Sequence, residues 1–234
     1  MKRLNLFLTL SSSNILLITI ERFSFTGKVF LPPDNFLHLH EVFQILVLIL
    51  ATVVIPFFIL RLLTNNFESL KTKKGFTLAL LFIIGLYFYS TGNGAHEVAS
   101  FIFNTFCPIK TFTSSFCKSS FINDYYFGNI LYFIGAFLMY ISLIKFEIMN
   151  PDPSFNKKDR LILYINSVIY AFTIFAYAAF DRVLVGLVYS LTTTAVIYYL
   201  FLSSKKKLST LPFTLYNVVA YTLGTVASLI ARFH

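Results

Sequence analysis

Residues 42–60 read VFQILVLILATVVIPFFIL, a stretch in which no side chain carries a charge. An α-helix needs about 20 mostly apolar residues to cross the hydrocarbon core of a bilayer. The stretch is therefore predicted to be a membrane-spanning helix. It lacks the strict alternation of apolar and polar residues that a strand of a membrane β-barrel would show.

Similar apolar stretches recur along the chain. Hydrophobic residues make up 57% of its 234 positions and charged residues only 12%, about half the charged share of a soluble domain. So few charges cannot cover a water-facing surface, which excludes a soluble enzyme, a secreted disulfide-rich domain, a coiled coil and a disordered tail. We expect an all-α, multi-pass protein of a plasma or bacterial inner membrane, folded as one bundle over residues 1–234. Seven spans are predicted, at about 4–20, 38–63, 76–104, 125–149, 161–180, 183–203 and 211–232.

The first span has two interpretations. Met1-Lys2-Arg3 followed by an apolar stretch is also typical of a signal peptide. Polar residues 11–14 interrupt that stretch, however, and no convincing cleavage motif precedes Glu21. We favour a spanning helix, and both interpretations leave the rest of the chain on the same side.

Basic residues predict the orientation. The N-terminus and three alternate connections hold Lys2, Arg3, Arg61, Lys71, Lys73, Lys74, Lys145, Lys157, Lys158, Arg160, Lys205, Lys206 and Lys207. The opposite side holds the six others, Arg22, Lys28, Lys110, Lys118, Arg182 and Arg232. Cytoplasmic loops carry the excess of Lys and Arg, so the N-terminus is predicted inside and the C-terminus outside. The expected partners are membrane lipids and not nucleic acid, which would require basic residues gathered on one polar face; the oligomeric state stays open.

The only two cysteines, Cys107 and Cys117, fall in the third-to-fourth connection, which is predicted to be external. An oxidising compartment permits a disulfide between them. Two unpaired thiols are the alternative.

Polar side chains collect at the predicted external side. A helix that starts near Phe76 on the inside carries His96 to the outer interface after about 30 Å, the level of His38 and His40. Gly92-Asn93-Gly94 either continues this helix or breaks it, which would leave 95–106 as a separate outer segment. The same side holds Glu41, Asn93, Glu97, Asp124, Asn129 and Asp181.

These side chains suit a metal. Imidazoles and carboxylates bind zinc or non-haem iron, so His38, His40 and His96 are the candidate ligands. Glu97 or Asp124 would be the catalytic proton shuttle, while Glu41, Asn93, Asn129 and Asp181 would complete the pocket. The leading hypothesis is a metal-dependent hydrolase of a lipid or lipid-linked substrate.

Two other classes stay open. His40 and His96 stand at matched depth, so they could ligate haem b in an electron carrier. Alternatively, the polar residues cap helices and pair with cations in a non-catalytic ligand-binding or transport protein.

Three features carry a resemblance to a known group: His96 after Gly92-Asn93-Gly94, Asp124 at the outer end of the fourth span, and the His38/His40 pair. With seven spans, the chain resembles in topology the alkaline-ceramidase and adiponectin-receptor group of membrane hydrolases. The resemblance implies zinc held by histidines within a seven-helix bundle and hydrolysis of lipid amides.

Overall fold

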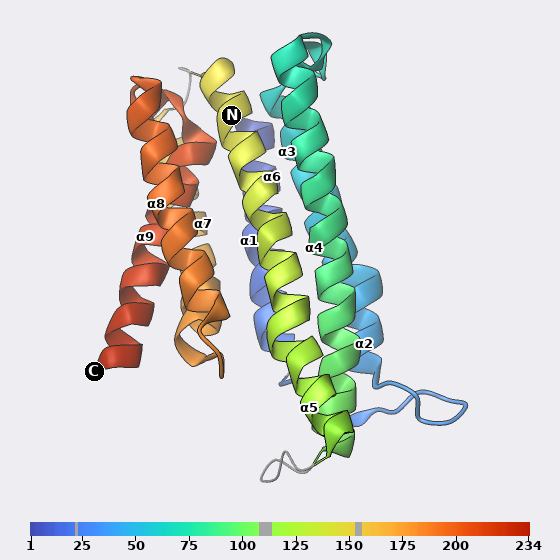
Figure 1. Cartoon of the computed structure of the whole chain (residues 1–234). Coiled ribbons are helices and arrows are strands. Elements are labelled where there is room, and N and C mark those ends of the chain that lie inside the picture. The colour runs from blue at the N-terminus through green and yellow to red at the C-terminus, as the bar shows by residue number, and fades with distance from the viewer. Residues whose placement is uncertain (22, 108–113, 153–155) are drawn as a thin grey trace.

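The computed structural model describes residues 1–21, 23–107, 114–152 and 156–234. Within these ranges the regular structure is helical, apart from one isolated β-bridge between Phe30 and His38. Seven helical segments are long and apolar enough to cross a membrane (Figure 1). The prediction of an all-α bundle with seven candidate spans is thereby confirmed.

The spans are made of the following elements. The first is α1 (Lys2–Glu21); the second is a continuous run of α2 (Leu39–Phe43), the π-helix η2 (Gln44–Ile49) and α3 (Leu50–Leu63); the third is α4 (Lys73–Phe106). The fourth joins α5 (Ser115–Ile122), the π-helix η4 (Asn123–Gly128) and α6 (Asn129–Met149). The last three are α7 (Lys157–Phe180), α8 (Val185–Ser204) and α9 (Pro212–Phe233). Short 3-10 turns, η1 (Phe25–Lys28), η3 (Glu68–Lys71) and η5 (Leu208–Thr210), lie in the connections.

Two predicted boundaries differ from the structure. The fourth span was predicted to start at residue 125, but its helix begins at Ser115, where the Ser114 side chain accepts a hydrogen bond from the Cys117 backbone N–H at 3.1 Å. The third helix runs unbroken through Gly92-Asn93-Gly94. The alternative prediction of a separate helical segment over 95–106 is therefore wrong.

The helices alternate in direction, so the two ends of the bundle differ in chemistry. The N-terminus lies at the upper end in Figure 1, with the connections that follow α3, α6 and α8, and the C-terminus lies at the lower end. We call the upper end the basic end, since it holds the larger group of Lys and Arg residues. The lower end, which holds His38, His40 and His96, we call the His–acid end. Of the basic residues predicted on this second side, Arg22 and Lys110 lie outside the described residues.

Glycines allow α4 and α6 to pack closely. A Cβ added at Gly92 would lie 2.7 Å from the Gly128 carbonyl oxygen and 2.8 Å from the Tyr132 Cα. One added at Gly135 would lie 2.6 Å from the Gly85 carbonyl oxygen. Because these neighbours are backbone atoms, they cannot rotate away. The glycines stand seven residues apart on each helix and so form one face of contact, as small residues commonly do between membrane helices.

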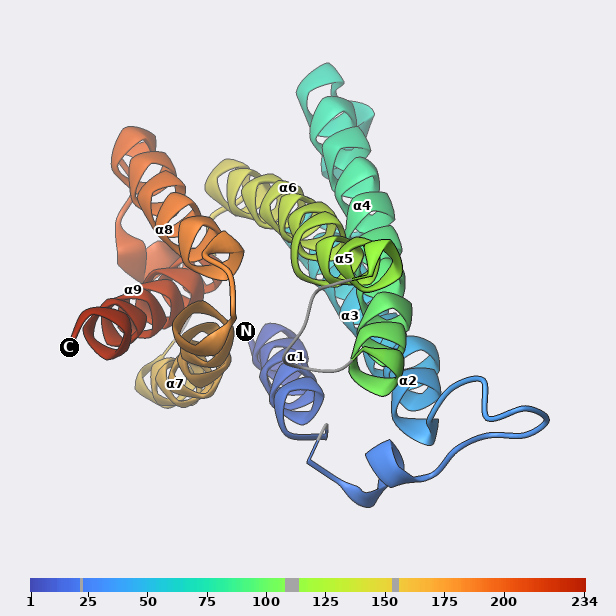
Figure 2. The ribbon, with the colours of Figure 1, turned by 60° about the horizontal axis from the view of Figure 1, so that its bottom comes forward.

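A polar seam joins α1 to α7. Asn5 Nδ2 donates to Asp159 Oδ1 at 3.1 Å, and the Ser12 hydroxyl donates to the Asn166 carbonyl oxygen at 3.1 Å. Ser12 also lies 2.8 Å from the hydroxyl of Tyr216 on α9. Ser12, which interrupts the apolar run in sequence, is thus fully buried as an interhelical contact. In Figure 2, α1 stands between α7 and the α2–α3 side of the bundle.

Candidate functional site

At the His–acid end, His40 joins three helices. It precedes η2 in the second span, and its Nδ1 contacts the carboxylate of Glu21, the last residue of α1. Its Nε2 lies 4.0 Å from Glu97 Oε2 on α4. One imidazole therefore lies between carboxylates from two other spans.

Glu21 is the functional candidate that sequence reasoning missed. It is only 9% exposed. Besides His40, it accepts hydrogen bonds from Gln44 Nε2 at 3.3 Å, from the Ser24 hydroxyl at 3.3 Å and from the Thr26 hydroxyl. The signal in the sequence was an acidic residue at the end of an apolar helix. A carboxylate buried there requires hydrogen-bond donors, so partners are expected nearby.

His96 pairs with Asp124 across α4 and η4. His96 Nδ1 lies 2.8 Å from Asp124 Oδ1, an ion-pair distance. The same nitrogen forms a hydrogen bond with the backbone carbonyl oxygen of Asp124 at 3.2 Å. Gly128 makes this approach possible, since a Cβ there would lie 2.9 Å from the His96 Cα. The Asp124 carboxylate is 1% exposed, and its Oδ1 is held in an ion pair with His96.

His38 and Glu41 form a local helix cap. The His38 backbone N–H donates to Glu41 Oε2 at 2.9 Å, and His38 Nδ1 lies 3.3 Å from the same oxygen. The His38 ring packs between Phe30 and Phe101, at 4.2 Å and 5.0 Å between ring centroids. Both residues therefore have a structural role, as the N-terminal cap of α2.

The remaining predicted pocket residues are engaged elsewhere. The side-chain amide of Asn93 donates to the Tyr89 carbonyl oxygen at 2.8 Å, and that of Asn129 to the Tyr125 carbonyl oxygen at 3.2 Å, each within its own span. Asp181 ends α7, and its carbonyl oxygen accepts a hydrogen bond from Arg232 at 2.5 Å. Burial raises the pKa of the Asp181 carboxyl above its usual range.

Two π-helical segments border the cluster. η2 begins at Gln44, next to the His40–Glu21 contact, and η4 contains Asp124. Single π-helical turns within α-helices are rare and occur frequently at functional sites. Their position here favours a site made by the polar cluster as a whole rather than by its helix caps alone.

The cluster has more acceptors than it can satisfy. We call Glu21, His40, Gln44, His96, Glu97 and Asp124 the outer cluster. It has three carboxyl groups and two imidazoles, so its acidic groups outnumber its basic ones. The buried Gln44 Oε1 has no hydrogen-bond donor in the part of the chain that the structure describes. A buried oxygen without a donor is costly in a protein interior, and a bound donor would remove that cost.

The arrangement does not by itself form a metal site. Across residues 1–21, 23–107, 114–152 and 156–234, no three His, Cys, Asp or Glu side chains are grouped so that they could hold a metal ion. His40 Nδ1 contacts the Glu21 carboxylate, and its Nε2 lies 4.0 Å from Glu97 Oε2. Zinc, non-haem iron and haem b stay predictions.

Cys107 and Cys117 are joined in a disulfide. The bond ties the end of α4 to the first turns of α5, where both cysteines pack with Phe103.

Fold and site together have the form expected of a multi-pass membrane protein with a buried polar cluster at one end of the bundle. Searches of protein-family models, of curated proteins and of solved structures give no match to this chain. The assignment of function therefore depends on the geometry of the cluster.

Proposed function

We propose that this chain is an integral membrane protein that binds a small cationic ligand in the outer cluster, as a receptor or carrier and not as an enzyme. The ligand is one with N–H donors, such as a primary ammonium ion. Following the predicted orientation, the site opens to the extracytoplasmic side.

The single observation that supports this proposal is the excess of carboxyl groups over imidazoles in the outer cluster, where Glu21 and Asp124 are buried. A cation in a site of low dielectric constant is attracted far more strongly than in water. Its N–H groups would donate hydrogen bonds to the carboxylate oxygens of the cluster. Ionisable residues within membrane spans commonly mark ligand or ion pathways.

A pair of matched probes tests the proposal. Butylammonium and tetramethylammonium carry the same charge, but only butylammonium donates hydrogen bonds. We expect butylammonium to raise the melting temperature of the detergent-purified chain at concentrations where tetramethylammonium has little effect. Equal effects of the two ions would contradict a donor-specific site.

Two substitutions locate the effect. Asp124→Asn removes the buried charge, and we expect it to weaken butylammonium binding at least tenfold. Asp34→Asn removes an exposed charge from the connection at the same end of the bundle and should leave binding unchanged. Unaltered binding by Asp124→Asn, with an intact circular dichroism spectrum, would refute the proposal.

The metal-dependent hydrolase is a second candidate, favoured by one observation. The Nδ1 atoms of His38, His40 and His96 each face a carboxylate, of Glu41, Glu21 and Asp124 respectively. In metal sites such a carboxylate orients the imidazole so that its other nitrogen can bind the metal.

Elemental analysis and an absorption spectrum of the purified protein decide between the candidates. About one zinc or non-haem iron per chain, lost in His96→Ala, would support the hydrolase of a lipid or lipid-linked substrate. A Soret band would support haem b and an electron carrier. Protein without metal or colour that still binds butylammonium would support the cation site.

A further inference from the structure

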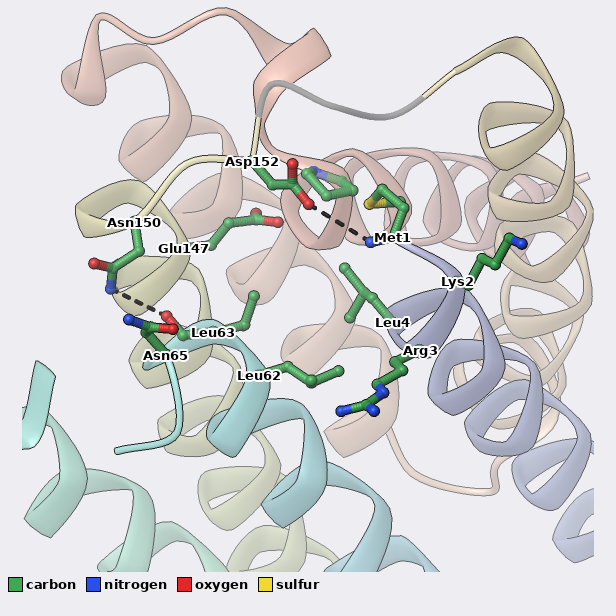
Figure 3. A pocket seen from close by; sticks show the side chains of 11 residues that line it. Met1, Lys2, Arg3, Leu4, Leu62, Leu63, Asn65, Glu147, Asn150 and Asp152 are labelled. Carbon is green, nitrogen blue, oxygen red and sulfur yellow. Dashed lines mark hydrogen bonds and ion pairs between the residues drawn. The ribbon is translucent and has the colours of Figure 1, made fainter. Parts of the chain in front are cut away.

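At the basic end, a cavity of about 410 Å³ lies among the ends of α1, α3, α6 and α9 (Figure 3). This volume is within the usual range for a small-molecule site. Leu4, Leu62 and Leu63 form an apolar wall, and Lys2 and Arg3 contribute the basic side chains. The cavity is thus apolar on one side and cationic on another.

The carboxylates of the cavity are already engaged. Glu147 accepts hydrogen bonds from the backbone N–H groups of Phe213 and Thr214 at 2.6 and 2.7 Å, where α9 begins. Asp152 lies 3.7 Å from the amino group of Met1, and Figure 3 draws this contact. Each negative charge therefore has a positive or donating partner of its own.

Lys2 and Arg3 make no ion pair within the described ranges, although both line the cavity. Figure 3 shows the Arg3 guanidinium beside Leu62, next to the apolar wall, while Lys2 extends to the other side of α1. A guanidinium binds phosphate oxygens with two parallel hydrogen bonds. The cavity therefore offers an unneutralised cation adjacent to apolar surface.

We propose that this cavity binds the phosphate headgroup of an anionic phospholipid from the leaflet at the basic end. Arg3 would contact the phosphate, and the adjoining acyl chain would lie against Leu4 and Leu62. Basic pockets between membrane helices on the cytoplasmic side are suited to such headgroups. A soluble phosphate ester shares the headgroup chemistry but not the acyl chain. The inference is independent of the cation site, which lies at the opposite end of the bundle.

The test titrates the full chain in mild detergent with dioleoylphosphatidylglycerol, dioleoylphosphatidylcholine or glycerol phosphate, and follows lipid retention by native mass spectrometry. We expect the wild-type chain to retain one phosphatidylglycerol and to lose phosphatidylcholine. Equal binding of glycerol phosphate would identify a soluble ester as the source of the phosphate.

Three variants separate the cavity from general surface charge. In the double variant Lys2→Gln/Arg3→Gln, the retained phosphatidylglycerol should fall at least tenfold. Leu62→Trp, which fills the apolar wall without changing charge, should do the same. Lys73→Gln/Lys74→Gln removes two exposed charges at the same end and should retain the lipid. The proposal fails if both cavity variants retain the lipid as the control does, or if all three lose it equally.

Discussion

Two glycines on one helix give the sharpest test of the α4–α6 interface. Gly92 faces backbone atoms of α6, with the Gly128 carbonyl oxygen 2.7 Å from an added Cβ, whereas a Cβ at Gly94 would have no neighbour within 4 Å. Gly92→Ala and Gly94→Ala therefore add the same methyl group to the same helix in opposite surroundings. Helix propensity alone favours both substitutions, by about 0.8–1.0 kcal/mol.

The packing cost decides the sign at Gly92. Extra methyl groups in packed interiors cost about 1–3 kcal/mol, and backbone neighbours place Gly92 at the upper end of that range. Subtracting the propensity gain leaves Gly92→Ala destabilised by about 2 kcal/mol. Gly94→Ala should be stabilised by about 0.5–1 kcal/mol, because only propensity acts there.

The assay is reversible unfolding in mixed detergent micelles with increasing sodium dodecyl sulfate, followed by far-ultraviolet circular dichroism. The difference between the two variants should be about 3 kcal/mol. Gly92→Ala with a stability equal to that of Gly94→Ala would refute the close approach of α4 and α6. It would also remove the basis for placing His96 beside Gly128, since the same interface positions both.

Three further predictions use the same unfolding assay. Glu147→Gln leaves two backbone N–H groups of α9 with one weaker acceptor. Because charge-assisted bonds contribute about 1.5–3 kcal/mol each, we expect a loss of about 2–4 kcal/mol. The exposed control Glu68→Gln should change stability by at most about 0.5 kcal/mol, and similar losses in both variants would contradict a buried cap. Replacing Cys107 and Cys117 by Ser opens a short loop and should cost about 2–3 kcal/mol, a loss that a reductant reproduces in the wild-type chain but not in the variant. Because burial raises the Asp181 pKa, the folded state holds that proton more tightly, so stability should fall as pH rises through the raised pKa; Asp181→Asn should flatten this fall, and an unchanged pH profile would oppose the argument.

The spans could be predicted because membrane insertion is decided by local composition. The charge-free stretch 42–60 and the clusters of basic residues between spans are readable without any contact information. The start of the fourth helix could not be predicted in the same way. Asp124 and the polar residues before it are typical of a loop in sequence, but in the structure Asp124 lies beside His96 and continues a helix.

The histidines could be assigned to one end because span lengths and alternating direction fix their depth. Their partners could not be assigned. Glu21 meets His40 only because α1 ends where the second span begins its first turns. Glu147 caps α9 from α6, and Arg232 donates to the Ala178 carbonyl oxygen at the end of α7, so both depend on tertiary packing. No periodicity or spacing within one segment signals such contacts.

Hydrogen-bond satisfaction identifies the structural residues within the predicted pocket. Asn93, Asn129 and the His38–Glu41 pair are satisfied by their own spans, as polar residues in an apolar environment must be. Asn5 Oδ1 and Asn217 Oδ1 are also buried without a hydrogen-bond donor among the described residues, so an unpaired oxygen does not by itself mark a binding role. Asp124, whose Oδ1 lies 2.8 Å from His96 Nδ1, belongs to η4, a π-helical turn that departs from regular α-helix and holds the carboxylate at a buried position. Asp124 combines a buried carboxylate, an ion pair with His96 and a π-helical turn, and it is therefore the residue on which the proposed cation site depends.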